Sequence, residues 1–167
     1  MHLQNHSAFW RFFCQRIKYP YHRNLYYIRR LTQKLTDLSA DELIWLARKR
    51  MTATRYRVSD SFVEDLKSSL TLTGMSSCAL SHLGLVASST SIDGYAPDID
   101  KIVSEFHLLV DTTGNCIIRT AVDAPEGLLD EKEMPITVVA ADLAASLNVR
   151  ERRSGLDYLE KSLSGIS

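Results

Sequence analysis

The sequence of 167 residues is poor in cysteine and has no long apolar run. Its three cysteines lie far apart, and they form neither a CxxC pair nor a cysteine–histidine cluster with metal-ligand spacing: Cys14, Cys78 and Cys116. Few and widely spaced cysteines favour a protein of a reducing compartment. No apolar run approaches the roughly 20 residues that cross a bilayer, and the first residues lack the uninterrupted apolar stretch of a secretory signal. We therefore expect a cytoplasmic protein with no membrane partner.

Motifs of common enzymes are also missing. The sequence contains no P-loop, GxGxxG, GxSxG or HExxH, and no serine, histidine and acid form a convincing constellation by their order. A nucleotidyltransferase would need clustered metal-binding acids near a Gly-Ser turn, and the sequence has none. We therefore expect a protein that is not an enzyme and that uses no cofactor and no metal.

The sequence does have a strong segregation of charge, which its net charge of zero hides. Residues 1–58 contain 12 Lys and Arg against 3 Asp and Glu, a balance of +9, whereas residues 59–167 contain 8 against 17, a balance of −9. Such asymmetry suggests contact with nucleic acid or an acidic surface, or pairing of the two parts with each other.

Aromatic residues are segregated in the same way, since 10 of the 14 lie before Val58. Rings interleaved with Arg and Lys can stack on exposed bases while the cations neutralise phosphates. The alternative is that these rings belong to a core or face a protein partner. Both interpretations stay open at the level of sequence.

The first 70 residues predict a basic arm followed by helices. Residues 1–23 form a basic aromatic arm, which is compatible with disorder, with an amphipathic surface segment or with a leader. Apolar spacing predicts helices over 24–36, 39–50 and 60–70. Residues 24–70 are therefore a basic helical segment, in the position of a divergent DNA-binding part.

The helix over 39–50 carries the clearest local signal. Ser39 and Glu42 form a capping box, in which each side chain bonds the backbone N–H of the other residue. Cations at a helix C-terminus are favoured by the helix dipole, which explains the basic residues at the end of this helix better than those beyond it. The whole basic stripe is our candidate for contact with DNA phosphates: Arg48, Lys49, Arg50, Arg55 and Arg57.

Residues 71–167 predict an acidic domain with several short helices. One helix of small residues ends at Gly84, which has the role of a C-cap, and another spans 97–106. Two more helices begin near Pro135 and after Asn148. This part supplies most of the acidic residues of the chain.

The same part predicts one β-hairpin. Residues 107–111 and 115–122 have the alternation of strands, and Thr112-Thr113-Gly114 supplies the turn between them. The predicted fold class is therefore α+β, mostly helical with a small antiparallel β-hairpin or sheet and a basic helical N-terminal part.

Four segments of this second part follow one another in the order and spacing of a known family. They are LTGMSSCALSHLGL (72–85), DGYAPDIDKIVSEFHL (93–108), GNCIIRTA (114–121) and VVAADLAASLNVRERRSGLDYLEKSL (138–163). The first is similar to the Ser-Ala-Leu-x-x-x-Gly-Leu opening of that family. Residues 72–163 thus resemble the C-terminal region of AbiEi-like bacterial regulators, which are related to abortive-infection antitoxins.

The resemblance implies a transcriptional regulator or antitoxin, because members of the family carry a winged helix-turn-helix ahead of this region. It implies DNA and a cognate toxin as partners, and a homodimer as a further possibility. Residues 24–70 do not align with a standard recognition helix. A protein-interaction module, or a truncated regulator without DNA affinity, is therefore the alternative function. Salt bridges from the basic stripe to acids after Asp60 would favour the alternative, whereas one shared open face would favour DNA.

Overall fold

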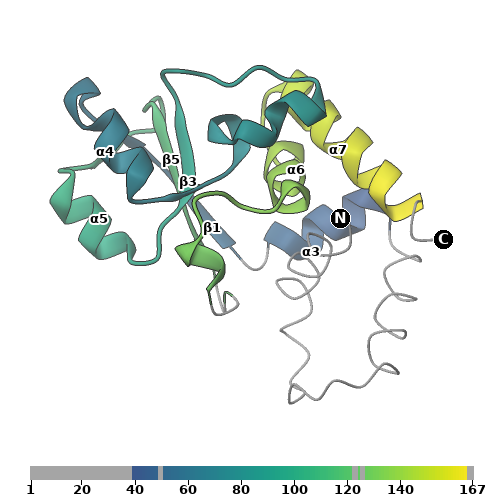
Figure 1. The fold of residues 1–167 in the computed structure, drawn as a ribbon, viewed down its shortest axis with the longest axis horizontal. Helices are drawn as coiled ribbons and strands as arrows, with labels where there is room; N and C mark the ends of the chain where they lie inside the picture. Colours follow the sequence, from purple (N-terminus) through teal and green to yellow (C-terminus); the bar gives the residue numbers. More distant parts are fainter. Residues whose placement is uncertain (1–38, 49–50, 122–123, 125–126, 165–167) are drawn as a thin grey trace, which may run out of the picture.

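A five-stranded sheet lies at the centre of the computed structural model, which describes residues 39–48, 51–121, 124 and 127–164 (Figure 1). The predictions for residues 1–23 and 24–36 lie outside this range. The strands are β1 (Met51–Arg57), β2 (Thr71–Leu72), β3 (Ile92–Tyr95), β4 (Leu109–Val110) and β5 (Cys116–Ala121). Their order in the sheet is β2-β3-β5-β1-β4, and every neighbouring pair is antiparallel except β3 and β5.

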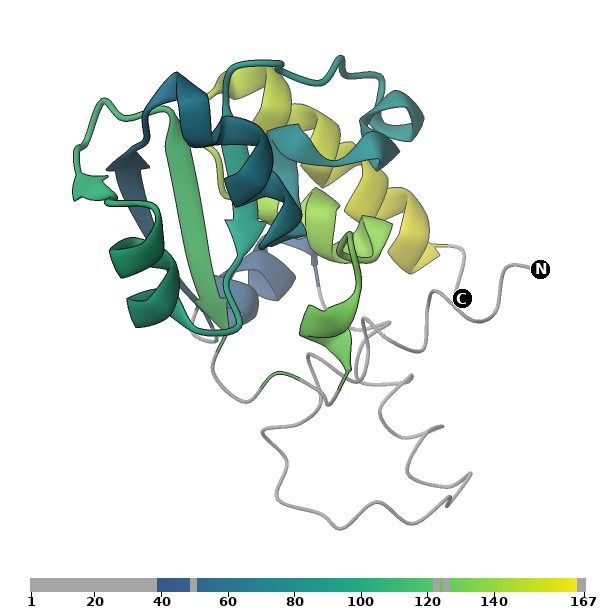
Figure 2. The ribbon, with the colours of Figure 1, turned by 60° about the vertical axis from the view of Figure 1, so that its left-hand side comes forward.

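The predicted hairpin is wrong in its pairing. The segments predicted as its arms do form β4 and β5, but β1 lies between them and pairs with both (Figure 2). The chain therefore crosses β1 on its way from Val110 to Cys116. Gly114 lies so close to the backbone of Tyr56 and Arg57 that a Cβ atom there would clash with both. Glycine at this position allows the crossing.

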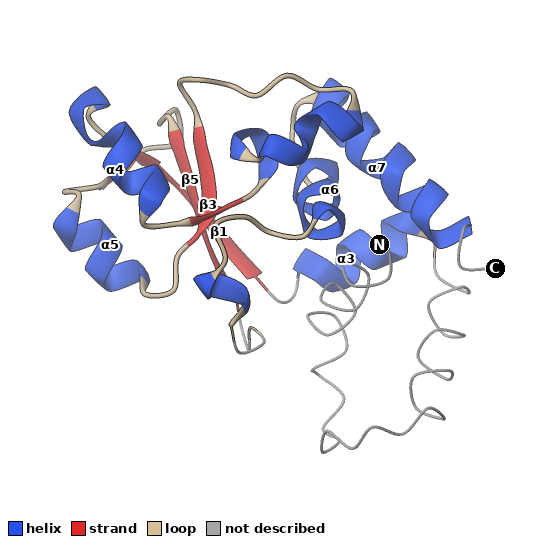
Figure 3. Ribbon diagram, in the orientation of Figure 1, coloured by secondary structure: helices blue, strands red, loops and turns tan. Residues whose placement is uncertain are grey.

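Helices cover both faces of the sheet (Figure 3). They are α3 (Ala40–Arg48), α4 (Val63–Ser68), α5 (Ile99–Glu105), α6 (Ile136–Ala144) and α7 (Val149–Ser164). One face packs on α4 and α5 in a core that includes Tyr56, Leu66, Ile102 and Ile118. The other face packs on α6, with α3 and α7 beyond it, in a second core. The fold is thus a layered α/β sandwich, and none of its described helices is long and apolar enough to span a membrane.

The capping box predicted for α3 is confirmed, and the helix predicted over 97–106 forms as α5 with a start two residues later. The backbone N–H of Ser39 donates to Glu42 Oε2 at 2.9 Å, and the backbone N–H of Glu42 donates to Ser39 Oγ at 3.3 Å, which is the predicted capping box. The hydroxyl of Ser39 also donates to Glu42 Oε2, at 2.9 Å, and the two bonds that this carboxylate accepts from Ser39 hold the pKa of Glu42 below its ordinary value. Asp98 caps α5, because its side chain accepts the backbone N–H of Lys101.

The other helices predicted within residues 51–164 form with adjusted ends. The helix predicted over 60–70 begins as a 3-10 turn at Asp60–Phe62 and continues as α4. The helix of small residues is a 3-10 helix, Cys78–Leu83, and it ends at Gly84, whose φ of 67° is the left-handed C-cap conformation. Pro135 precedes α6 directly, and α7 follows Asn148 as predicted.

Helix α6 is the central helix of the second core. Every residue from Thr137 to Ala144 is buried, because the sheet, α3 and α7 surround it. Helix α7 approaches it closely at Gly155, where a Cβ atom would clash with the backbone of Ala140 and Ala144. The absence of a side chain at Gly155 therefore sets the distance between the two helices.

We predict that Gly155→Ala destabilises the protein, although alanine is the better helix former by about 1 kcal/mol. The methyl group has to displace α6 backbone, and such overpacking costs about 1–3 kcal/mol. The measurement is the free energy of unfolding in urea. Asp157→Ala, at an exposed position of the same helix, is the matched control and should change it by less than about 0.5 kcal/mol. An increase in stability for Gly155→Ala would contradict the close packing.

Candidate functional site

The structure places the five predicted DNA-contact residues in different settings. Arg48 is the last residue of α3, and Lys49 and Arg50 lie outside the described residues. Arg55 and Arg57 lie in β1, both with exposed side chains. Because side chains alternate along a strand, Arg55 and Arg57 share the face opposite the buried Tyr56. The structure thus brings two of the five together.

Both of these guanidinium groups bind the segment that crosses β1. Arg55 Nη1 donates to the carbonyl oxygen of Gly114 at 3.0 Å. Arg57 Nε donates to Asp111 Oδ2 at 2.6 Å, and its Nη2 donates to Thr113 Oγ1 at 3.2 Å. Hydrogen bonds from Thr113 and the ion pair with Arg57 lower the pKa of Asp111 to about 2. The two arginines therefore fix the crossing between β4 and β5.

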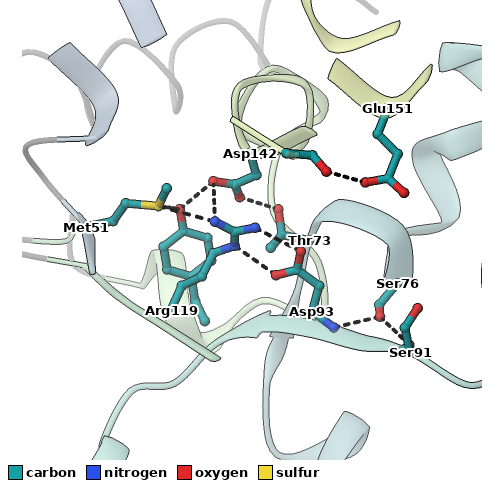
Figure 4. A network of polar contacts seen from close by, with 10 residues as sticks. Met51, Thr73, Ser76, Ser91, Asp93, Arg119, Asp142 and Glu151 are labelled. Carbon is teal, nitrogen blue, oxygen red and sulfur yellow. Dashed lines mark hydrogen bonds and ion pairs between the residues drawn. The ribbon is translucent and has the colours of Figure 1, made fainter. Parts of the chain in front are cut away.

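A buried charge cluster lies at the centre of the molecule, and the sequence analysis missed it. It consists of Asp93 from β3, Arg119 from β5 and Asp142 from α6, with exposed fractions of 6%, 6% and 4% (Figure 4). Arg119 Nε and Nη2 donate to the two carboxylate oxygens of Asp93, each at 2.8 Å. Its Nη1 lies 3.5 Å from Asp142 Oδ1. This fork binds one carboxylate with two parallel hydrogen bonds and contacts the other with its third nitrogen.

Two neutral side chains complete the coordination of Asp142. The hydroxyl of Thr73 donates to Oδ2 at 2.6 Å, and the hydroxyl of Tyr95 donates to Oδ1 at 3.1 Å. The cluster therefore joins β3, β5, α6 and the end of β2. Its buried carboxylates have the partners that a buried charge requires.

The electrostatics of the cluster are unbalanced, because two carboxylates share one guanidinium. Burial raises the pKa of Asp142 to about 6, and nearby Asp93 adds to the rise while Arg119 opposes it. Burial acts to lower the pKa of Arg119, but Asp142 and Asp93 outweigh it and keep that pKa above its ordinary value. Burial and the charge of Asp142 also raise the pKa of Tyr95 well above its ordinary value. Asp142 is thus a buried carboxyl group that holds its proton more tightly than a free aspartate does.

A pocket of about 360 Å³ adjoins this cluster. Its floor comes from β1, β3 and β5, and its wall comes from the end of α6, the turn after it and the start of α7. Its charged lining residues are Arg55, Asp93, Arg119, Asp142 and Glu151. Apolar side chains, Ala53, Ile117 and Leu143 among them, supply much of the remaining surface.

The two cysteines in the described part of the chain offer little nucleophilic character. Cys116 is buried, and burial raises the pKa of its thiol to about 12. Cys78 is exposed, but its thiol donates to Glu133 Oε2 at 2.9 Å, and this bond raises the pKa of the thiol. A reactive thiol needs a lowered pKa.

No group of three or more His, Cys, Asp and Glu side chains that could hold a metal occurs among the described residues.

Comparison with known proteins gives no match that would help to interpret this geometry. No family model matches the chain, and no curated protein or solved structure matches it significantly. The resemblance to AbiEi-like regulators therefore stays a prediction from the four sequence segments.

We predict that Asp142 makes the protein less stable as the pH rises from about 4 to about 6. Its pKa is about 6 in the folded protein and near 3.8 in the unfolded chain, so the folded state holds the proton more tightly. The stability that this proton contributes is complete below pH 4 and is lost through pH 6. Between those limits, wild type should lose of the order of 2 to 3 kcal/mol more than Asp142→Asn.

The measurement is urea unfolding at several pH values, with the difference between wild type and Asp142→Asn as the readout. Other groups, such as Asp111, titrate in both proteins and cancel in this difference. Asp157→Asn, a substitution of an exposed carboxylate, should keep the slope of wild type. Parallel curves for wild type and Asp142→Asn would show that Asp142 does not take up a proton in this range.

Proposed function

We propose that this chain is a non-catalytic, antitoxin-like regulator of the cytoplasm, and that its described part acts by binding protein. The observation that carries the proposal is an open, apolar edge of the sheet at β4. Leu109 and Val110 have exposed fractions of 69% and 73%. Exposed apolar residues on an edge strand favour pairing with another chain.

The opposite edge of the sheet is closed by the protein itself. The backbone N–H of Leu72 in β2 donates to the carbonyl of Lys132 at 2.9 Å, and the N–H of Met134 donates to the carbonyl of Leu72 at 2.8 Å. Residues 132–134 thus cover β2. Among the described residues, β4 has strand pairing on one side only.

The geometry of β4 fits a second copy of this chain. Asp111 N–H donates to the carbonyl of Arg55, so the backbone groups of Val110 point away from β1, because these groups alternate along a strand. Two copies related by a two-fold axis can exchange N–H···O=C bonds between their Val110 residues. Since the β2 edge is covered, this pairing can occur once per chain and closes at a dimer.

A substitution in β4 tests this dimer. Val110→Pro removes the outward N–H, and Leu109→Lys places a charge on the edge, so both should convert a wild-type dimer to a monomer. Val86→Lys is the control, since Val86 has an exposed fraction of 81% on a loop. The readout is the molar mass of the full chain by light scattering. A monomeric wild type at the highest soluble concentration would overturn self-pairing and leave a cognate toxin as the partner to test at this edge.

DNA binding is the second candidate, and the exposed position of Arg55 and Arg57 on one face of β1 favours it. The ion pair of Arg57 with Asp111 argues against it, because this guanidinium already has an acidic partner after Asp60. Protein–DNA interfaces are much more positive than this mixture of charges. We therefore rank protein binding first for the described part of the chain.

We expect Arg55→Gln and Arg57→Gln to bind DNA as wild type does. The measurement is a mobility-shift titration of the full chain on duplex DNA from upstream of its own gene, at several salt concentrations. If β1 does contact phosphates, each substitution should reduce the log–log salt slope by about 0.9. Such a loss, in variants that remain folded, would restore DNA contact as the function of β1.

A further inference from the structure

The pocket beside the buried charge cluster has the form of a small-molecule site. Its volume of about 360 Å³ lies within the roughly 300–1,000 Å³ that such sites occupy. Its floor is the sheet face opposite α4 and α5, where Ala53, Arg55 and Ile117 point away from the core around Tyr56. The pocket is therefore a concavity between the sheet and the α6–α7 corner.

The lining of the pocket includes two groups of opposite charge, and both have unused hydrogen-bonding capacity. Arg55 gives one of the five N–H groups of its guanidinium to Gly114, and the structure shows no described partner for the other four. Glu151 Oε2 accepts the hydroxyl of Ser146 at 2.6 Å, whereas its Oε1 has no described partner (Figure 4). The pocket thus offers a donor fork for a carboxylate and an acceptor for an ammonium group.

We propose that this pocket binds a small zwitterion of the α-amino-acid class with an aliphatic side chain. Arg55 binds its carboxylate, Glu151 binds its ammonium group, and its side chain packs on Ala53 and Ile117. This ligand site is independent of the β4 edge, so it extends the proposed function and does not rest on it.

The charges around the pocket favour a zwitterion over a simple ion. The carboxylates of Asp93, Asp142 and Glu151 outnumber the cations Arg55 and Arg119, so a lone anion meets net repulsion. A lone cation has no acceptor for the free N–H groups of Arg55, so these groups lose their contact with water and gain no hydrogen bond when the cation fills the pocket. A ligand with both charges satisfies both groups, and its aliphatic body covers the apolar floor.

The test uses three probes that share the isobutyl side chain of leucine, titrated into the full-length protein by calorimetry. They are leucine, 4-methylpentanoate, which is leucine without the ammonium group, and 3-methylbutylamine, which is leucine without the carboxylate. Leucine should bind saturably and more tightly than either single-charge probe, because only it engages Arg55 and Glu151 together. The absence of saturable binding by leucine, or equal binding of all three probes, would overturn the proposal.

Substitutions then locate the site. Arg55→Gln and Glu151→Gln should each weaken leucine binding by about tenfold or more, because each removes a charge-assisted hydrogen bond. Arg57→Gln is the matched control, since Arg57 lies two residues further along β1 and does not line the pocket. Arg55→Lys keeps the positive charge and should bind leucine more tightly than Arg55→Gln. This comparison keeps the test valid if the loss of the bond to Gly114 lowers the stability of both variants. Equal binding by all folded variants would place the ligand elsewhere and reject this pocket.

Discussion

The guanidinium of Arg119 is the constraint on which the arrangement of the layers depends. It is buried between the sheet and α6, and its bonds to Asp93 and its contact with Asp142 connect two parallel strands to the central helix. A charge in this position is stable only while its partners stay in place, and breaking a buried pair typically costs about 3–5 kcal/mol. The fork of Arg119 needs both parallel hydrogen bonds to Asp93 at once, which defines a single geometry. The cluster therefore fixes how α6 sits on the sheet.

Local structure could be predicted from the sequence because its signals lie within a few residues of each other. The capping box of Ser39 and Glu42, the C-cap at Gly84 and the start of α6 after Pro135 each depend on neighbours in the chain. Strand β1 gave no such signal, because its polar sequence resembles a basic surface segment. Its strand character comes from pairing with Cys116–Ala121, which no local pattern reveals. The hairpin prediction failed for the same reason, since β1 occupies the space between its two arms.

The buried charge cluster could have been found from a different kind of signal. Arg119 interrupts an otherwise uncharged strand, and Asp142 interrupts the apolar run of α6. A lone charge within an apolar segment needs a buried partner of opposite sign, so the two interruptions predict each other. The sequence does not show that Thr73 and Tyr95 join them, because those contacts depend on the final packing. The same holds for the pocket, because two of its lining residues of opposite charge, Arg55 and Glu151, lie far apart in the chain.

The position of β1 has a consequence for how the protein is made. Its partners in β5 lie 60 to 70 positions later in the chain, so β1 leaves the ribosome long before the strand that pairs with it exists. Until then its backbone groups have no sheet to join, and such delayed non-local pairing slows folding and exposes strand edges. Release of residues 1–58 by proteolysis would also remove the strand between β4 and β5. The basic beginning and the acidic remainder of this chain are therefore one folding unit in the region of the sheet, despite their opposite charge.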